Sequence, residues 1–357
     1  MNSSPLSLLL FAICGCLLLG CAACNSSKLA GKQANDANQR LAFYNVENLF
    51  DTQDDPVTFD EEFTPDSKKK WSSERFQSKL DNLCRVVEGM EFPAILGLCE
   101  VENAQVVKDF IEKTALSKYQ YQYAHFDSPD KRGIDVALLY QSKLFQVLHS
   151  EAIPIQFPEE VIAKEPDYTT RDILYVRGIY QKVDTLHLFV NHWPSRRGGL
   201  KASEPKRLYV AGELRKRVDQ LFSENSASKI IVMGDMNDEP ENNSVLTQLQ
   251  AARTPGPPSR IDYLYNCSAQ LDYQGKGSYN YRGNWNMLDQ IIVSGALIRK
   301  GASLRASDMQ TYRQDWMMYT DPKHGQRPSR TYGGPNYYGG FSDHLPVFIE
   351  LQRDNNS

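Results

Sequence analysis

The stretch "KIIVMGDMNDEP" (residues 229–240) decides how this chain is read. Its apolar run, Ile230 to Met233, predicts a short buried strand, because the run is too short for a helix and is rich in β-branched residues. Asp235 and Asn237 follow directly, so the strand delivers a carboxylate and an amide to one edge of a sheet. Loops at such an edge are where functional side chains collect.

Other predicted strands end in the same way, with Asn, Asp, Glu or His. They deliver Asn45 within residues 41–46, Glu100 after 94–98, His192 after 186–190, Asp289 in "NMLDQIIVS", and Asp343 with His344 in "GFSDHLPVFIEL" (residues 340–351). A single such residue is usually a turn former, and that interpretation stands for Asn48 and Asp238. The recurrence is better explained by a cleft that these strand ends share.

Two helical segments lie between the strands. Ser72 or Ser73 can cap a helix with an apolar face, and residues 203–222 predict a second helix with Ser203 as its cap and Pro205 in its first turn. Strands that alternate with helices, with hairpins towards the C-terminus, predict sheets packed face to face and covered by helices.

The N-terminus predicts export. No charge precedes Lys28, and the apolar run from Leu6 to Leu19 is short for a membrane span but fits a signal peptide. Leu18-Leu19-Gly20-Cys21 looks like a bacterial lipobox, whereas Cys16 and Cys24 lack that context. We therefore expect a lipoprotein-type signal peptide (1–20) with lipidation at Cys21, a flexible tether (21–40) and a domain (41–352). A plain signal peptide or a buried helix are the alternatives.

Composition limits the partners. The net charge of −4 argues against broad adhesion to nucleic acid but leaves room for a nuclease with a local basic rim. Beyond the N-terminal region only Cys84, Cys99 and Cys267 remain, with no Cys/His zinc spacing and no disulfide framework. Cys84 and Cys99 could pair in an oxidising compartment, although small buried apolar residues are the more common role.

The chemistry of the predicted cleft points to phosphate esters. Several carboxylates without a thiolate favour a hard divalent cation, and two imidazoles supply proton transfer near neutral pH. Arginine and amide groups match the oxygens of a phosphoryl group in its transition state. No GxSxG nucleophile motif is present. Together these groups describe attack of water on a phosphoester.

Gly234-Asp235-Met236-Asn237 followed by Ser342-Asp343-His344, with Asn45 and Glu100 upstream, resembles the endonuclease/exonuclease/phosphatase superfamily, the deoxyribonuclease-I-like proteins. The resemblance covers essentially the whole predicted domain. It implies a four-layer α/β sandwich in which two central mixed β-sheets are flanked by helices, with the site at one edge. With the predicted leader, the chain would be a bacterial exported lipoprotein of this superfamily.

The resemblance also implies roles for individual residues. Asn45, Glu100 and Asp343 would hold a metal, Mg²⁺ with Mn²⁺ or Ca²⁺ as alternatives. Asp235 would orient the attacking water, Asn237 would touch the phosphate, Asp289 would hold His344, His192 would contact the phosphate, and Arg171 would lie near it. Asn191 directly precedes His192, which departs from the family's Asn-x-His. Tyr123, His125 and Asp127 are candidates for a tyrosine or acid found in some branches, and Asp135 is expected to organise its own loop.

Two segments bear on the substrate. Arg196 and Arg197 lie in a basic turn before a helix, which suits either anion binding or a solvated loop. Tyrosines in residues 327–344 could stack on bases or on a sugar. We expect a monomeric endonuclease-type phosphodiesterase that cleaves nucleic acid and is anchored at the bacterial cell envelope. A phosphatase or phospholipase-type phosphodiesterase acting on inositol phosphates or phospholipid head groups is the alternative, and a non-catalytic surface binding protein comes third.

Overall fold

The computed structural model describes residues 39–257 and 259–353. The predicted signal peptide, Cys21 and most of the predicted tether lie outside the described residues. Strand β1 (Gln39–Leu49) begins two residues before the predicted domain boundary at 41, so the last two residues of the predicted tether belong to a sheet. Within the described ranges, no helix combines the length and the hydropathy needed to cross a membrane.

Sheet A is a mixed sheet of seven strands. Its order is β14 (Leu304–Ala306), β20 (Val347–Arg353), β1, β2 (Ile95–Val101), β4 (Asp135–Gln141), β3 (Tyr121–His125), with β15 (Gln310–Thr311) also paired to β20. Strands β1 and β2 run parallel, and the other pairs of this sheet are antiparallel.

Sheet B also has seven strands and is mixed. Its order is β5 (Phe145–Ile153), β6 (Ile173–Tyr180), β7 (Asp184–His192), β8 (Lys229–Asp235), β13 (Asp289–Ser294), β10 (Leu264–Asn266), β9 (Ala251–Ala252). The pairs β7–β8 and β9–β10 are parallel, and the remaining pairs are antiparallel.

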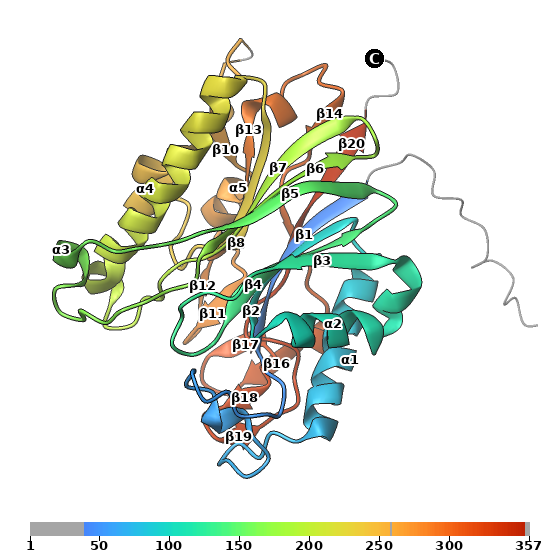
Figure 1. Cartoon of the computed structure of the whole chain (residues 1–357), viewed down its shortest axis with the longest axis vertical. Helices are drawn as coiled ribbons and strands as arrows, with labels where there is room; N and C mark the ends of the chain where they lie inside the picture. Colours follow the sequence, from blue (N-terminus) through green and yellow to red (C-terminus); the bar gives the residue numbers. More distant parts are fainter. Residues whose placement is uncertain (1–38, 258, 354–357) are drawn as a thin grey trace, which may run out of the picture. The chain divides into compact units, whose positions relative to one another are not determined.

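Helices cover the outer faces of the two sheets. Figure 1 shows α4 (Leu200–Glu224) on one side of the paired sheets and α1 (Ser73–Gly89) with α2 (Ala104–Glu112) on the other. The shorter helices are α3 (Glu159–Ile162), α5 (Ala269–Tyr273) and the single turns η1 (Glu61–Phe63), η2 (Ala115–Tyr119), η3 (Ser244–Gln248), η4 (Gly295–Leu297) and η5 (Asp315–Met317).

Alternation along the central strands builds the core. In β1, Ala42 and Tyr44 join the apolar cluster under α1 and α2, whereas Leu41 and Phe43 join the cluster between the two sheets. Strand β8 divides its side chains in the same way between the inter-sheet cluster and a third cluster under α4. Side chains point to opposite faces with a period of two, so each central strand is buried on both faces. Three apolar interfaces make four layers, and the predicted fold is confirmed.

The helix predictions have different outcomes. Ser72 caps α1 as predicted, and its Oγ accepts a hydrogen bond from the backbone N–H of Arg75 (3.4 Å). The prediction that Ser203 caps α4 is wrong, because that helix begins at Leu200 and Ser203 is buried inside it. The Ser203 hydroxyl donates to the carbonyl of Gly199 (2.8 Å) and is therefore committed within the helix.

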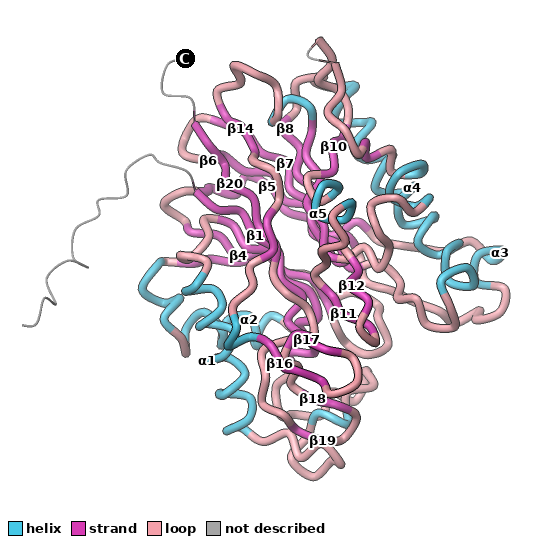
Figure 2. Tube along the Cα trace, turned by 180° about the vertical axis from the view of Figure 1, so that it is seen from behind, coloured by secondary structure: helices cyan, strands magenta, loops and turns pink. Residues whose placement is uncertain are grey.

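Three short hairpins gather near one end of the sheets, the lower end in Figures 1 and 2. They are β11 (Tyr279–Tyr281) with β12 (Asn284–Asn286), β16 (Met318–Asp321) with β17 (Gly325–Pro328), and β18 (Tyr332–Gly333) with β19 (Asn336–Tyr337). They confirm the hairpins expected towards the C-terminus.

The three cysteines of the described residues are buried and free. Cys84 belongs to the cluster under α1, whereas Cys99 faces the other sheet. The two thiols thus lie on opposite faces of sheet A, and the interpretation of small buried apolar residues is confirmed.

Candidate active site

The polar strand ends of both sheets meet at one place. Sheet A contributes Asn45 from β1 and Glu100 from β2, and sheet B contributes residues at the ends of β7, β8 and β13. In sheet B the register pairs Asp235 with His192 on one side and with Asp289 on the other. The topology therefore forces these side chains into one cluster.

The carboxylate of Asp235 lies at the centre of this cluster. Its Oδ2 accepts a hydrogen bond from Asn45 Nδ2 (3.1 Å), which crosses from sheet A to sheet B. The same oxygen lies 3.8 Å from His192 Nε2 and 3.9 Å from His344 Nε2. The backbone N–H of Asn237 donates to Oδ1 (2.9 Å) and fixes the carboxylate. Burial raises the pKa of Asp235 to about 6.

The glycine before Asp235 has a steric reason. A Cβ at Gly234 would lie 2.4 Å from the carbonyl oxygen of Asn191 on the neighbouring strand. Glycine therefore permits the close approach of β7 and β8 that brings His192 beside Asp235.

His344 is held by a carboxylate. Its Nδ1 lies 2.6 Å from Oδ2 of Asp289, and both side chains are buried. Burial disfavours the charged imidazolium, but the carboxylates of Asp289, Asp235 and Asp343 together outweigh it and raise the pKa of His344 well above its ordinary value. This pair also joins the two sheets within the cluster, because His344 precedes β20 of sheet A and Asp289 belongs to sheet B. The ring of Tyr279 packs against the imidazole, with 4.7 Å between ring centroids.

His192 has a different environment. Burial lowers its pKa well below the ordinary value, and the nearby Arg171 guanidinium lowers it further. Its Nδ1 is buried and has no hydrogen-bond partner among the described residues. Asn191 points away from the cluster, where its Oδ1 accepts from the indole N–H of Trp193 (3.2 Å). Strand alternation thus separates the roles of these two adjacent residues.

Arg171 is a brace behind His192. Its Nε donates to the carbonyl of His192 (3.1 Å), Nη2 donates to that of Trp193 (2.6 Å), and Nη1 pairs with Asp130 (2.9 Å). The guanidinium is buried and its nitrogens are committed to these partners. The resemblance predicted Arg171 near the phosphate. In this structure its guanidinium holds the backbone at the end of the strand that carries His192.

Two further basic residues follow β7. Arg196 is half-buried and donates to the carbonyl of Asn237 (2.7 Å), whereas Arg197 is exposed. Asp238, which we expected to be a simple turn former, is buried and pairs with Arg207 (2.7 Å). Its side chain ties the loop after β8 to α4, because Arg207 belongs to that helix.

Glu100 joins the cluster from sheet A. Its Oε2 accepts from the backbone N–H of Asn48 (2.9 Å), and its Oε1 lies 3.4 Å from Asn45 Nδ2. Asp343 forms an ion pair with Arg330 (3.2 Å) and is half-buried. Of the three predicted metal ligands, Asn45 and Glu100 are therefore in direct contact, and Asp343 lies in the turn that precedes His344.

Two buried charged residues beside these ligands, Glu47 and Lys79, were not predicted as part of the site. Burial raises the pKa of Glu47 to about 7, and the neighbouring Asp343 adds to the effect. The ammonium of Lys79 is buried below them and donates to Thr331 Oγ1 and to the carbonyl of Phe341 (2.6 Å each). Lys79 lies on the apolar face of α1. A lysine at such a position in the sequence could have indicated a buried charge.

The backbone is strained where the strands end. Of the described non-glycine residues with positive φ, four belong to these strand ends, namely Glu47 (51°), Asn48 (52°), Glu100 (63°) and Asn237 (48°). Each such residue costs of the order of ~1 kcal/mol or more and persists only where its surroundings hold it. Here the side chains of the cluster accept hydrogen bonds from several of the strained N–H groups. The strain and the polar cluster therefore occupy the same strand ends.

The cluster fits a divalent cation. One ligand atom from each of Asp235, Asp289 and His344 lies within 4.8 Å of the others. Oδ1 of Asp289 is buried and has no hydrogen-bond partner within the described part of the chain, which leaves a carboxylate oxygen available. The raised pKa values of Asp235 and Glu47 indicate that the buried negative charge lacks compensation, which a cation would supply.

Comparisons with known proteins agree with this geometry. A family model described as "Endonuclease/Exonuclease/phosphatase family" matches residues 40–353. TDP2 of Caenorhabditis elegans is similar in structure (TM-score 0.53, 16% identity, 88% of this chain and 98% of that chain). So are a mannosyl-6-phosphatase of Bacteroides thetaiotaomicron (0.53, 15%, 88% and 99%) and the human Nocturnin catalytic domain (0.51, 16%, 89% and 95%). No curated protein matches the chain.

At these identities the solved structures establish the fold, a deoxyribonuclease-I-like arrangement of two mixed sheets with helices. The family model spans almost all of the described residues. The chain therefore belongs to the endonuclease/exonuclease/phosphatase family and is a phosphoester hydrolase of the metal-dependent type.

Proposed function

We propose that this enzyme is an exported phosphodiesterase that cleaves nucleic acid by attack of an activated water. The observation that carries the chemistry is the position of Asp235, whose Oδ2 lies between His192 Nε2 (3.8 Å) and His344 Nε2 (3.9 Å). A carboxylate between two imidazoles can take a proton from water while the imidazoles bind the phosphate oxygens.

Each residue of the cluster has a proposed role. Asp235 accepts the proton of the attacking water and orients its lone pair. Asp289 keeps His344 protonated and oriented, so that His344 donates a hydrogen bond to the oxygen on which negative charge accumulates. His192 contacts a second phosphate oxygen. Arg171 is a positioning residue, because it holds the backbone of His192 and does not face the reaction.

The metal is proposed to be Mg²⁺, with Mn²⁺ or Ca²⁺ as substitutes. Glu100, Asp343 and Asn45 would hold it on the sheet A side, and the oxygen of Asp289 without a partner offers a ligand on the sheet B side. When bound, the cation supplies polarisation of the phosphate. The buried ammonium of Lys79 lies close to Glu100 and Asp343 and partly offsets their negative charge when no cation is bound.

The hairpins beside the site favour nucleic acid as substrate. Tyr281 (52% exposed) and Tyr319 (47% exposed) each carry an arginine against the ring, Arg282 at 5.1 Å and Arg327 at 5.2 Å. Exposed aromatic rings with adjacent guanidinium groups can stack on bases and bind the backbone, at ~1–3 kcal/mol per stacked base. Arg282 adds local positive charge to this rim in a chain whose net charge is −4, whereas Arg327 is also paired with Asp321 (3.2 Å).

The rim is also continuous with the catalytic cluster. Strand β11, which carries Tyr281, places Tyr279 on the imidazole of His344. The segment after β17 carries Arg330 to Asp343. A strand of nucleic acid lying on the two hairpins would thus lead its phosphates to the site.

The experiment uses the purified full chain with three substrates in parallel. We would follow bis-p-nitrophenyl phosphate, p-nitrophenyl phosphate and a single-stranded oligonucleotide with Mg²⁺, Mn²⁺ or chelator. Chelator-sensitive cleavage of the diester and the oligonucleotide supports the proposal. Cleavage of the monoester with an intact oligonucleotide would replace it by the phosphatase alternative, and inactivity on all three would favour a binding protein.

Location is a separate proposal that rests on the sequence of the leader. Acylation of Cys21 would anchor a monomeric enzyme to the bacterial envelope. Cells that express the chain should incorporate radiolabelled palmitate into it, and Cys21→Ala should abolish the label. Labelling that survives this change would remove Cys21 as the anchor.

A further inference from the structure

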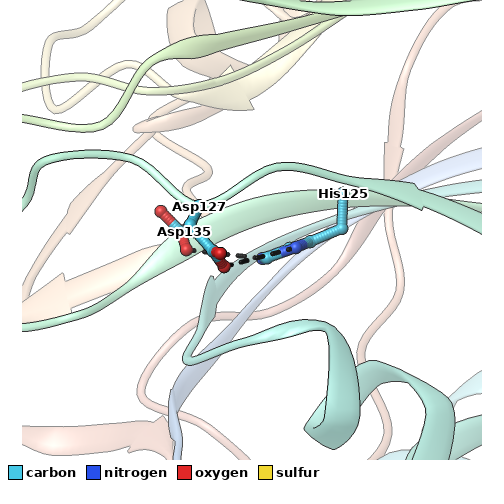
Figure 3. A group of neighbouring side chains, drawn as sticks. All are labelled: His125, Asp127 and Asp135. Carbon is cyan, nitrogen blue, oxygen red and sulfur yellow. Dashed lines mark ion pairs between the residues drawn. The ribbon is translucent and has the colours of Figure 1, made fainter. Parts of the chain in front are cut away.

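A second group of ionisable residues lies at the start of the β3–β4 hairpin. His125 is the last residue of β3, Asp135 is the first residue of β4, and Asp127 lies in the loop between them. Figure 3 shows the three side chains pointing toward one another. One ligand atom from each residue lies within 4.8 Å of the others. None of the three belongs to the catalytic cluster described above.

The imidazole of His125 is buried, and its Nε2 makes no hydrogen bond of good geometry. Its side chain is only 2% exposed, yet Nε2 has no hydrogen-bond partner among the described residues. An unpaired buried nitrogen costs about 1–3 kcal/mol unless something outside the chain satisfies it. The nearest acid is Asp135, whose Oδ2 lies 3.4 Å from Nε2. This nitrogen therefore requires an explanation.

The separation of 3.4 Å is informative. Two ligands of a tetrahedral zinc ion, each ~2.0–2.2 Å from the metal, lie about 3.3–3.5 Å apart. Nε2 and Oδ2 already have the spacing of two metal ligands.

Asp127 is the third candidate ligand and lies beside the other ring nitrogen of His125, Nδ1. Oδ1 of Asp135 accepts hydrogen bonds from the backbone N–H (3.0 Å) and the hydroxyl of Ser128, which leaves Oδ2 facing His125. This confirms that Asp135 organises its loop, and it is also the outer-shell support that metal ligands need. The side chain of Asp127 is 86% exposed and its Oδ1 lies 3.9 Å from His125 Nδ1. It is free to turn towards a cation and leaves the site open to water ligands.

We propose that His125, Asp127 and Asp135 bind a divalent transition metal of the Zn²⁺ type, separate from the catalytic cation. One imidazole and two carboxylates are ligands that zinc accepts, with water completing the tetrahedron. The sequence lacks only the zinc sites that have Cys/His spacing, and the site proposed here contains no cysteine. The metal closes the loop of residues 126–134, which carries Asp130, the partner of Arg171. By holding this loop, the metal would keep Asp130 in place beside Arg171, which in turn contacts the backbone of His192.

The test is zinc binding by the full chain and its variants, measured by equilibrium dialysis and by anomalous scattering at the zinc edge. Asp127→Asn changes an exposed residue and does not threaten folding, and Asp66→Asn, also exposed, is the matched control. We expect Asp127→Asn to lose one zinc equivalent or to bind it at least 10-fold more weakly. Asp66→Asn and the catalytic-cluster variant Asp289→Asn should retain that equivalent.

Two results would overturn the proposal. One is unchanged zinc stoichiometry and affinity in Asp127→Asn. The other is an anomalous peak only at the catalytic cluster, with none between His125 and Asp135. Neither result bears on phosphodiester cleavage, so this inference and the proposed function can fail independently.

Discussion

The two histidines of the candidate active site, His192 and His344, are both buried, yet their surroundings give them opposite chemistry. His344 has a carboxylate 2.6 Å from its Nδ1, and its pKa is raised well above the ordinary value. His192 has no such partner, and burial with the Arg171 guanidinium lowers its pKa. One imidazole is thus kept cationic and the other neutral within 4 Å of the same Asp235 oxygen. The difference teaches that the neighbouring residues set the charge state of a histidine here, since burial is common to both.

The largest expected effect comes from removing the carboxylate that makes the two histidines different. Asp289→Asn keeps the shape of the side chain but no longer stabilises a charged His344. We expect turnover to fall by about 10³-fold or more, as for triads that lose their aspartate. Steady-state kinetics on the diester would measure this, with Asp262→Asn, an exposed acid, as control. Turnover close to that of the wild type would exclude His344 as a cationic donor.

The second prediction concerns the brace on the His192 side. Arg171→Met leaves Asp130 buried without its partner, and removing one partner of a buried ion pair costs about 3–5 kcal/mol. Denaturant titration should show a loss in this range. The double variant Arg171→Met/Asp130→Leu should recover part of it, because no charge is then left unpaired. A single variant as stable as the wild type would show that the pair is not desolvated.

The third prediction uses a histidine outside the site to isolate the effect of burial. Burial lowers the pKa of His187, which contacts the hydroxyl of Tyr175, to about 4. Between pH 6.5 and pH 4 the unfolded chain therefore takes up a proton at this residue that the folded chain does not, and stability falls as the pH falls. With partial solvent exposure discounted, wild type should lose about 1–2 kcal/mol more than His187→Gln between pH 7 and pH 4.5. Parallel stability curves would contradict this.

The smallest effect is expected at Arg197, on the exposed loop after His192. Because its side chain is exposed, Arg197→Ala should change the free energy of unfolding by less than about 0.5 kcal/mol. If the loop binds phosphate, KM for an oligonucleotide should rise by roughly 2- to 5-fold at low salt, with kcat unchanged. An unchanged KM would assign the loop to solvent.

Local patterns in the sequence carried most of the fold. Apolar runs ending in Asn, Glu, Asp or His predicted the central strands, and the strand ends at Asn45, Glu100, His192, Asp235 and Asp289 do converge. These residues lie in the strands themselves, so the register within each sheet and the packing of the two sheets bring them together. The position of Ser203 was misjudged because the hydroxyl of a serine can equally bond backwards within a helix.

What the sequence could not reveal is pairing over long distances. Asp130 meets Arg171, and Lys79 meets residues of the C-terminal segment, only after the chain has folded. The resemblance predicted Arg171 near the phosphate, and only the structure adds its contacts with Asp130 and with backbone oxygens behind His192. The identity of a residue predicts its chemistry, but its partners decide whether that chemistry remains available.

Two of the bonds that cross between the sheets lie inside the cluster, from Asn45 to Asp235 and from His344 to Asp289, and they have a mechanical consequence. Each half of the cluster belongs to its own sheet, and the apolar layer between the sheets separates the two halves. A slip of a fraction of an ångström between the sheets would misalign the reacting groups while leaving every strand intact. Hydrostatic pressure or a mild co-solvent should thus abolish turnover well before it changes the circular dichroism. Turnover would then report the sliding of one sheet against the other.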